Sequence, residues 1–252
     1  MAVALGWQGH VDSNLSFSAF FDRDHTLVAR FMPQVSNAFE GPLIAENGSG
    51  LFVIGQGDWH QDGEGNKLLL AVGAGRCNYP APLRAGRWYH LALRVVVGTD
   101  VMTFQPFLNG NSLGAPMSVP RDDPGLPRGT MRFGKRTTGG TVNGHNAQYF
   151  GFLDEVAIFS TALPPVRIAA LASSTSPLTG DEPDLLSGFT FHGRHVQPRM
   201  ARSTSLHGVA KLVGTSENWD SAADAALLPL PPQSAEMNLP FTVGEDWRVG
   251  TR

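Results

Sequence analysis

The sequence predicts an all-β sandwich or jelly roll, made of two antiparallel sheets and one short helix, on three observations. Glycine, proline, asparagine and aspartate recur every 8–14 residues between about 15 and 160, the spacing typical of short strands joined by turns. The chain holds 29 glycines and 18 prolines among its 252 residues. Charged residues make up 16% of the chain, whereas about a quarter is typical of globular proteins. All-β sandwiches of this length commonly form one domain.

Nine segments are predicted to be strands, because each places apolar or β-branched residues between turn signals. In chain order they are LSFSAFF (15–21), HTLVARFMP (25–33), GPLIAENG (41–48), GLFVIGQG (50–57), KLLLAVGAG (67–75), WYHLALRVVVG (88–98), MTFQPFLNG (102–110), GTMRFGKR (129–136) and FGFLDEVAIF (150–159). The dipeptide Asn109-Gly110 predicts a tight hairpin turn, since both residues tolerate a positive φ.

One helix is predicted, over residues 164–172. Two prolines are favourable in its first turn, and an apolar face follows from Val166, Ile168, Ala169 and Leu171. The segment 174–186 has the composition of a linker, and the Pro-rich segment 225–240 is predicted to be extended. We therefore divide the chain into a sandwich domain at 1–173, a linker with additional strands that complete the sandwich at 174–230, and an extended tail at 231–252.

Composition argues against some partners and leaves the compartment open. A net charge of −3 provides no basic stripe for nucleic acid, and no run approaches the roughly 18 apolar residues of a membrane span. Cys77 is the single cysteine, so no internal disulfide forms. The first residues, MAVALGWQGHVDSN, lack the basic start and apolar core of a signal peptide. A secreted form of this chain would therefore carry its leader elsewhere.

Three segments, in this order, resemble the laminin-G-like, concanavalin A-like jelly roll of bacterial surface and secreted proteins. HTLVARFMP resembles its opening strand, and GRWYHLALRVVVGTD with FLNGNSLG resembles its central hairpin. MRFGKR with YFGFLDEVAIFSTAL is similar to its closing strand and the start of its helix. The resemblance covers roughly residues 15–172. It implies the fold, whereas its members include lectins, adhesion modules, lyases, hydrolases and structural spacers.

The start of the chain departs from the resembling family. Many relatives carry Phe-Asp-Gly followed by paired acids in the first strand, but this chain has Trp7, Gln8 and Gly9 there, with Asp12 as the nearby acid. In the central hairpin, Trp88 and His90 share one face of the strand. We expect Trp88 to pack against the sheet and His90 to be structural, with a ligand platform and a catalytic base as the alternatives.

Motifs of common enzymes are absent from the sequence. It contains no G-x-S-x-G, no H-E-x-x-H, no cysteine pair and no phosphate-binding G-x-x-x-x-G-K. The E-x-D-x-x-E array of jelly-roll β-glucanases is also missing, and the adjacent acids of LDEVAIF are expected on opposite faces of their strand. The last residues, LPFTVGEDWRVGTR, resemble the segment that precedes lysostaphin-type zinc peptidase domains, but the His and Asp ligands of that site do not follow. We expect no enzyme activity.

Two polar loops are the candidate ligand site. The first, 55–67, offers Asp58, Trp59, His60 and Asp62, and the second, 135–149, offers Asn143, His145, Asn146, Gln148 and Tyr149. Sugar sites combine such amides and acids, which bind hydroxyl groups, with an aromatic ring that contacts the apolar face of the sugar. We expect both loops at the same region of the sandwich. The alternatives are solvated turns, or calcium bound by Asp58, Asp62 and Glu64.

Asp154 and Glu155 interrupt an otherwise apolar strand. The resemblance implies that Asp154 helps to bind a structural calcium ion, with backbone carbonyls and Asp12 supplying further oxygen atoms. The alternative is that Asp154 accepts hydrogen bonds at a strand end, with Glu155 on the opposite face.

Together these features predict a non-catalytic carbohydrate-binding or adhesion module of a larger secreted or cell-surface bacterial protein, with a glycan as its partner. The alternatives are a structural spacer beside an enzyme domain, such as a peptidase, and a jelly-roll hydrolase or lyase with an unrecognised site.

Overall fold

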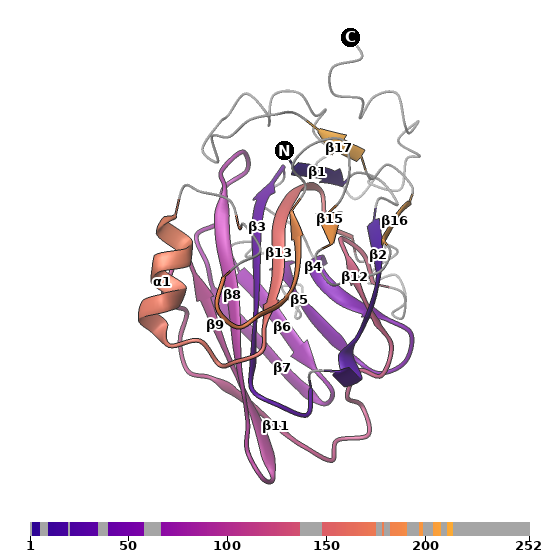
Figure 1. The fold of residues 1–252 in the computed structure, drawn as a ribbon, viewed down its shortest axis with the longest axis vertical. Coiled ribbons are helices and arrows are strands. Elements are labelled where there is room, and N and C mark those ends of the chain that lie inside the picture. Colours follow the sequence, from indigo (N-terminus) through magenta and orange to yellow (C-terminus); the bar gives the residue numbers. More distant parts are fainter. Residues whose placement is uncertain are drawn as a thin grey trace.

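Two antiparallel sheets pack face to face in the computed structural model of the chain (Figure 1). The structure describes residues 2–5, 10–19, 21–34, 40–57, 67–136, 148–174, 178, 182–190, 197–198, 204–207 and 211–213. Nearly all the regular structure in these residues is β, as the sequence predicts, and the arrangement is a jelly-roll sandwich.

The first sheet has ten strands, ordered β10-β9-β8-β3-β13-β1-β17 along its main path. In chain order these seven are β1 (Ala2–Leu5), β3 (His25–Pro33), β8 (Tyr89–Val97), β9 (Val101–Leu108), β10 (Asn111–Ser112), β13 (Gly151–Phe159) and β17 (Lys211–Val213). Three more extend it: β11 (Met117–Pro120) pairs with β9, β14 (Leu185–Thr190) pairs with β13, and β15 (Gln197–Pro198) pairs with β14.

The second sheet has seven strands, ordered β16-β2-β12-β4-β5-β6-β7. They are β2 (His10–Ser16), β4 (Glu40–Asn47), β5 (Phe52–Gly57), β6 (Lys67–Val72), β7 (Gly75–Pro80), β12 (Thr130–Phe133) and β16 (Thr204–His207). Segments after residue 184 thus pair with strands from the first third of the chain and with β13. The predicted boundaries at 173 and 230 remain predictions.

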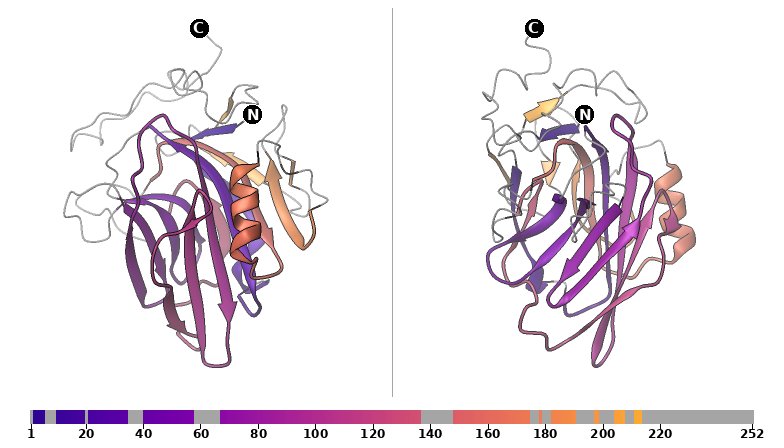
Figure 2. Two further views of the ribbon diagram at one scale, coloured as in Figure 1. Left: turned by 90° about the vertical axis from the view of Figure 1, so that its left-hand side faces the viewer. Right: turned by 180° about the vertical axis from the view of Figure 1, so that it is seen from behind.

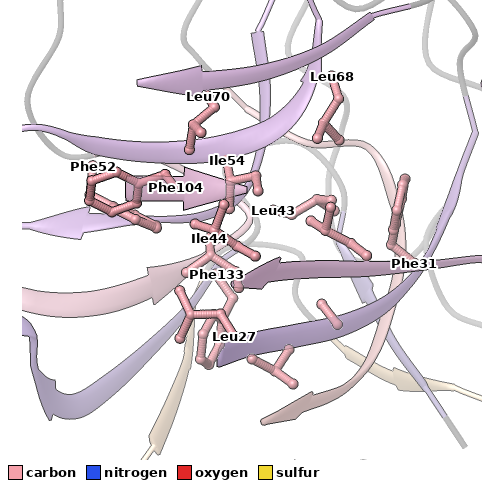
Figure 3. Packing of buried hydrophobic residues seen from close by; sticks show 14 of the residues in the cluster. Leu27, Phe31, Leu43, Ile44, Phe52, Ile54, Leu68, Leu70, Phe104 and Phe133 are labelled. Carbon is pink, nitrogen blue, oxygen red and sulfur yellow. The ribbon is translucent and has the colours of Figure 1, made fainter. Parts of the chain in front are cut away.

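The core lies between the two sheets and is built from alternate residues of each strand. Leu27 and Phe31 of β3 point toward Ile44, Phe52 and Leu70 of the second sheet, and all are at most 1% exposed (Figure 3). Because successive side chains of a strand point to opposite faces, the residues between them, such as Val28 and Arg30, point out of the sandwich.

The helix α1 (Pro165–Ser173) covers the outer face of the first sheet (Figures 1 and 2). Pro165 stands at its start, as predicted, and Ile168 is fully buried against Val28, Ala92 and Phe159. The expected apolar face is narrower than predicted, because Val166 is 77% exposed.

The predicted strand at 15–21 is wrong in its second half. β2 ends at Ser16, and Phe17–Ala19 form a 3₁₀ turn in which the Phe21 amide donates to the carbonyl of Phe17. This turn brings the two phenylalanine rings to 5.4 Å between centroids in the core, an edge-to-face contact that an extended chain would separate.

The predicted hairpin is confirmed at Asn109-Gly110, with φ angles of 49° and 81° between β9 and β10. Gly110 also lies against the backbone of Ala169 in α1, where a side chain would clash. Within the described part of the chain, no helix is long and apolar enough to span a membrane.

Candidate functional site

The described ends of the two predicted ligand loops lie at one end of the second sheet. β5 ends at Gly57, which pairs with Glu40, the first residue of β4. After β12, Gly134 donates its amide to the carbonyl of Leu43, close to the same end of β4. Lys135 then pairs with Gln148, which closes the base of the second loop. Both loops therefore leave the sandwich together.

Most of the predicted ligand residues lie outside the described residues. These are Asp58, Trp59, His60 and Asp62 of the first loop, and Asn143, His145 and Asn146 of the second. The possible calcium ligands Asp58, Asp62 and Glu64 also lie outside the described residues. So does the C-terminal segment that resembles the approach to a zinc peptidase.

Tyr149 belongs to the core, which corrects its assignment as a ligand residue. Its side chain is fully buried, its hydroxyl donates to the carbonyl of Phe152, and its ring contacts Phe31 edge to face. Burial raises the pKa of the phenol, so the hydroxyl stays protonated. Gln148 is 3% exposed. Neither side chain presents a surface to a sugar.

Asp154 and Glu155 lie on the same face of β13, not on opposite faces as predicted. Asp154 pairs with Arg30 and Ala157 pairs with Val28, so Glu155 and Val156 together stand opposite the single residue Ala29. This β-bulge inserts one residue and interrupts the alternation of the strand. Glu155 has a φ of 48° there, and its amide donates to Oδ1 of Asp154 at 2.7 Å. Both acids consequently point out of the sandwich.

Glu155 forms a buried ion pair that fastens α1 to the sheet. Its Oε2 lies 2.7 Å from Nε of Arg30, and its Oε1 accepts the amide of Leu178 at 2.8 Å. Arg30 in turn donates through Nη2 to the carbonyls of Leu171 and Ser174 at the end of α1. The side chains are 10% and 4% exposed for Arg30 and Glu155. One ion pair therefore connects β3, β13, the helix end and the chain that follows it.

The structure does not bring together Asp12 and Asp154, the two side chains of the predicted calcium site. Asp12 lies on β2 in the second sheet, where both carboxylate oxygens contact the guanidinium of Arg132 on β12, at 2.5 and 3.1 Å. Asp154 belongs to the first sheet. Among the described residues, no group of three or more His, Cys, Asp or Glu side chains is placed to hold a metal.

A cavity of about 400 Å³ lies between the outer face of the first sheet and α1. We call it the helix-side cavity. Its floor carries Arg30, His90 and Glu155, and its walls include Leu171 and Leu178. The sequence predicts a structural role for His90 and gives no sign of the cavity, because the bulge and the packing of α1 decide which side chains meet there.

Trp88 contributes to packing, as predicted. Its ring centroid lies 6.3 Å from that of Phe152 on β13. His90 is 4% exposed, and burial together with the charge of Arg30 lowers its pKa to about 3, so its imidazole is neutral.

No protein-family model matches the sequence, and a comparison with curated proteins finds no match. Among solved structures, the fold is similar to that of a candidate carbohydrate-binding protein from Bacteroides ovatus, with a TM-score of 0.58 and 14% identity over 86% of this chain. This chain spans 61% of the length of that protein.

Two further similar structures are smaller. One is a pentraxin of the SAP-like type from Limulus polyphemus, with a TM-score of 0.49 and 13% identity over 81% of this chain and 93% of its own. The other is the CBM40 domain of the Ruminococcus gnavus IT-sialidase, with a TM-score of 0.49 and 14% identity over 69% of this chain and 97% of its own.

Proposed function

We propose that this chain is a non-catalytic carbohydrate-binding module of a larger secreted protein, with its site formed by the loops 55–67 and 135–149. The observation that carries the proposal is the position of the loop bases. Gly57 and Gly134 leave the sandwich at the same end of β4, so polar loops far apart in sequence start side by side. Binding residues concentrate on such loops, because a rigid sheet positions them.

The fold supports the same proposal. The Bacteroides ovatus structure with a similar fold is a candidate carbohydrate-binding protein. The amides and acids of the two loops suit sugar hydroxyl groups, and Trp59 suits the apolar face of a sugar ring. Asp58, Asp62 and Glu64 of the first loop also suit a calcium ion, since calcium takes six to eight oxygen ligands.

The absence of catalysis is supported by the state of two acids. Glycoside hydrolysis needs two carboxyl groups that flank an open substrate site. Glu155 is held by Arg30 and the Leu178 amide, and Asp12 by Arg132. Neither carboxylate is available to act as a general acid or as a nucleophile without first breaking a structural ion pair.

A glycan array, run with and without calcium, tests the proposal. We expect a defined group of glycans to bind, and Trp59→Ala and Asn146→Ala to weaken that binding without lowering the melting temperature. Asp122→Ala is the matched control, because this exposed residue follows β11 at the opposite end of the sandwich.

Two results would contradict the proposal. If no glycan binds at high protein density, a structural spacer becomes the better interpretation. If Trp59→Ala and Asn146→Ala bind normally but unfold at lower temperature, the loops are structural and the sugar site lies elsewhere.

A further inference from the structure

The helix-side cavity lies on a different sheet from the described bases of the two loops and has the size of a small-molecule site. Its volume of about 400 Å³ falls within the range of about 300–1,000 Å³ that is typical of ligand pockets. It lies over the outer face of the first sheet, whereas the loop bases belong to the second sheet. A ligand bound there would therefore be independent of the proposed sugar site.

The walls of the helix-side cavity are largely apolar. Val28 lines it from β3, Ala170 and Leu171 line it from α1, and Leu178 lines it from the chain after the helix. These aliphatic side chains favour a ligand with an apolar body, since burying apolar surface is the main favourable contribution to binding.

Most charged groups around the cavity are already paired with one another, and Glu182, which also lines it, has an interaction of its own. Arg30 contacts Glu155 at 2.7 Å, and Arg167 at the rim contacts Asp184 at 3.0 Å. A charged ligand buried against these pairs would lose its hydration without gaining a counter-ion, which is costly. The cavity therefore suits an uncharged molecule.

His90 supplies a neutral imidazole to the floor. It is 4% exposed, and its Nδ1 has no hydrogen-bond partner among the described residues. A buried polar atom in a native structure is normally satisfied, so an imidazole with an unsatisfied nitrogen at the floor of a cavity is a candidate hydrogen-bond partner for a ligand. A hydroxyl group fits either tautomer of the neutral ring, because it both donates and accepts.

We propose that the helix-side cavity binds an uncharged small molecule with an apolar body and a single hydroxyl group, which hydrogen-bonds to the imidazole of His90. The aliphatic walls hold the body, and the Arg30–Glu155 pair keeps the floor rigid by fixing β3, β13 and the end of α1. A free sugar suits the cavity less well, because each of its many hydroxyl groups needs a partner.

Benzyl alcohol and toluene are matched probes for this proposal, since they differ by one hydroxyl group. Methyl groups of Val28, Leu171 and Leu178 line the cavity and report binding in ¹³C-methyl NMR spectra of the full chain. We expect saturable shifts at these three residues with benzyl alcohol and about tenfold weaker binding of toluene, the effect of one hydrogen bond.

Three variants locate the site. Ala170→Phe adds a ring at an exposed position of α1 that lines the cavity, and it should abolish binding of both probes. Val166→Phe adds the same ring at a position on α1 that is 77% exposed and outside the lining, and it should change neither affinity. His90→Phe should bring the affinity for benzyl alcohol to that for toluene.

Each contrary result overturns part of the proposal decisively. Absence of saturable shifts with both probes, or binding that survives Ala170→Phe, removes the site. Equal affinity of the unchanged protein for the two probes would show that His90 does not bind the hydroxyl group. It would also contradict the proposed preference for a ligand with a hydroxyl group. If His90→Phe does not fold, the two-probe comparison on the unchanged protein and Ala170→Phe still decide the question. Sugar binding by the loops stands or fails separately on the glycan array.

Discussion

The two sheets each carry an arginine–carboxylate pair on neighbouring strands, and the two pairs differ in what surrounds them. On the first sheet, Arg30 and Glu155 are 10% and 4% exposed and lie beneath α1. On the second sheet, Arg132 and Asp12 are 13% and 24% exposed. Both pairs are close, at 2.7 and 2.5 Å. Distance alone therefore does not distinguish them.

The difference lies in their other hydrogen bonds. Arg30 and Glu155 also bind backbone groups of Leu171, Ser174 and Leu178, which belong to the helix end and the chain beyond it. Asp12 instead accepts a side-chain hydrogen bond from Asn47 on β4. The first pair thus holds a separate element onto the sheet, whereas the second links strands that the backbone ladder already joins. We expect loss of the first pair to have the larger effect.

Among the variants that test this comparison, Glu155→Gln should have the largest effect on the free energy of unfolding. The amide keeps the shape of the side chain but removes the carboxylate that pairs with the buried charge of Arg30. Breaking a buried pair in this way typically costs about 3–5 kcal/mol. We expect a loss of this size in the free energy of unfolding, measured by urea titration.

Arg30→Met and the double variant Arg30→Met/Glu155→Gln complete a thermodynamic cycle. The double variant should lose less stability than the two single variants together, because neither charge is then left alone. If the losses simply add, the ion pair is not the group that fastens the helix.

Acidification tests the same sheet through its buried imidazoles. Burial lowers the pKa of His25 to about 4, and burial with the nearby Arg30 lowers that of His90 to about 3. In the unfolded chain both imidazoles titrate near 6.5, so below that pH the unfolded state binds more protons and gains stability relative to the folded state. The stabilising contribution is present above pH 6.5 and is lost progressively toward pH 4 and pH 3.

We expect the free energy of unfolding to fall by about 3 to 4 kcal/mol between pH 7 and pH 5, at about 1.4 kcal/mol per pH unit for each imidazole. Urea titrations at several pH values measure it. His25→Gln and His90→Gln should each reduce the slope by about half. A flat profile would show that both rings accept a proton in the folded state.

Much of the fold follows from local sequence pattern. The strand 25–33 and the turn at Asn109-Gly110 were predicted with their observed bounds, because alternation and positive-φ tolerance are local properties. The predicted helix differs from α1 by one residue at each end. The turn at Phe17–Ala19 was missed, since core packing of Phe17 against Phe21 overrides a sequence that alternates like a strand.

The site was less predictable because it depends on irregularity. A period of two predicts Asp154 and Glu155 on opposite faces, but the bulge at Glu155 puts both on the outer face of the sheet. No local signal marks that extra residue. The sequence predicts Tyr149 as an aromatic residue of a ligand loop, but it lies in the core. This position could not be predicted locally, because its neighbours across the sandwich are far away in sequence. The helix-side cavity likewise depends on contacts between distant segments.

Asp12→Asn tests the second pair and is the matched counterpart of Glu155→Gln. Both changes replace a carboxylate by an amide opposite an arginine, but Asp12 is partly exposed and its pair lies between strands already joined. Water and salt weaken such a pair, which typically contributes up to about 1 kcal/mol. We expect a loss of that order in urea titrations, smaller still at 1 M salt. A loss as large as that of Glu155→Gln would remove the distinction between the two sheets.

Asp154→Asn carries the smallest expected effect and decides between the two interpretations of this acid. Oδ1 of Asp154 accepts the amide of Glu155 at 2.7 Å and so holds the bulge. An asparagine oxygen accepts the same hydrogen bond, so we expect the free energy of unfolding to change by less than about 1 kcal/mol, whereas Asp154→Ala removes the acceptor and costs more.

A ligand that binds only the folded state raises the melting temperature by mass action, so a calcium ion at Asp154 would make that temperature sensitive to chelators. Asp12 lies on the other sheet, bound to Arg132. We therefore expect a chelator to change neither the melting temperature of the unchanged protein nor that of Asp154→Asn. A chelator effect that Asp154→Asn abolishes would instead identify Asp154 as a calcium ligand, and the bulge would then have to supply oxygen atoms other than those of Asp12.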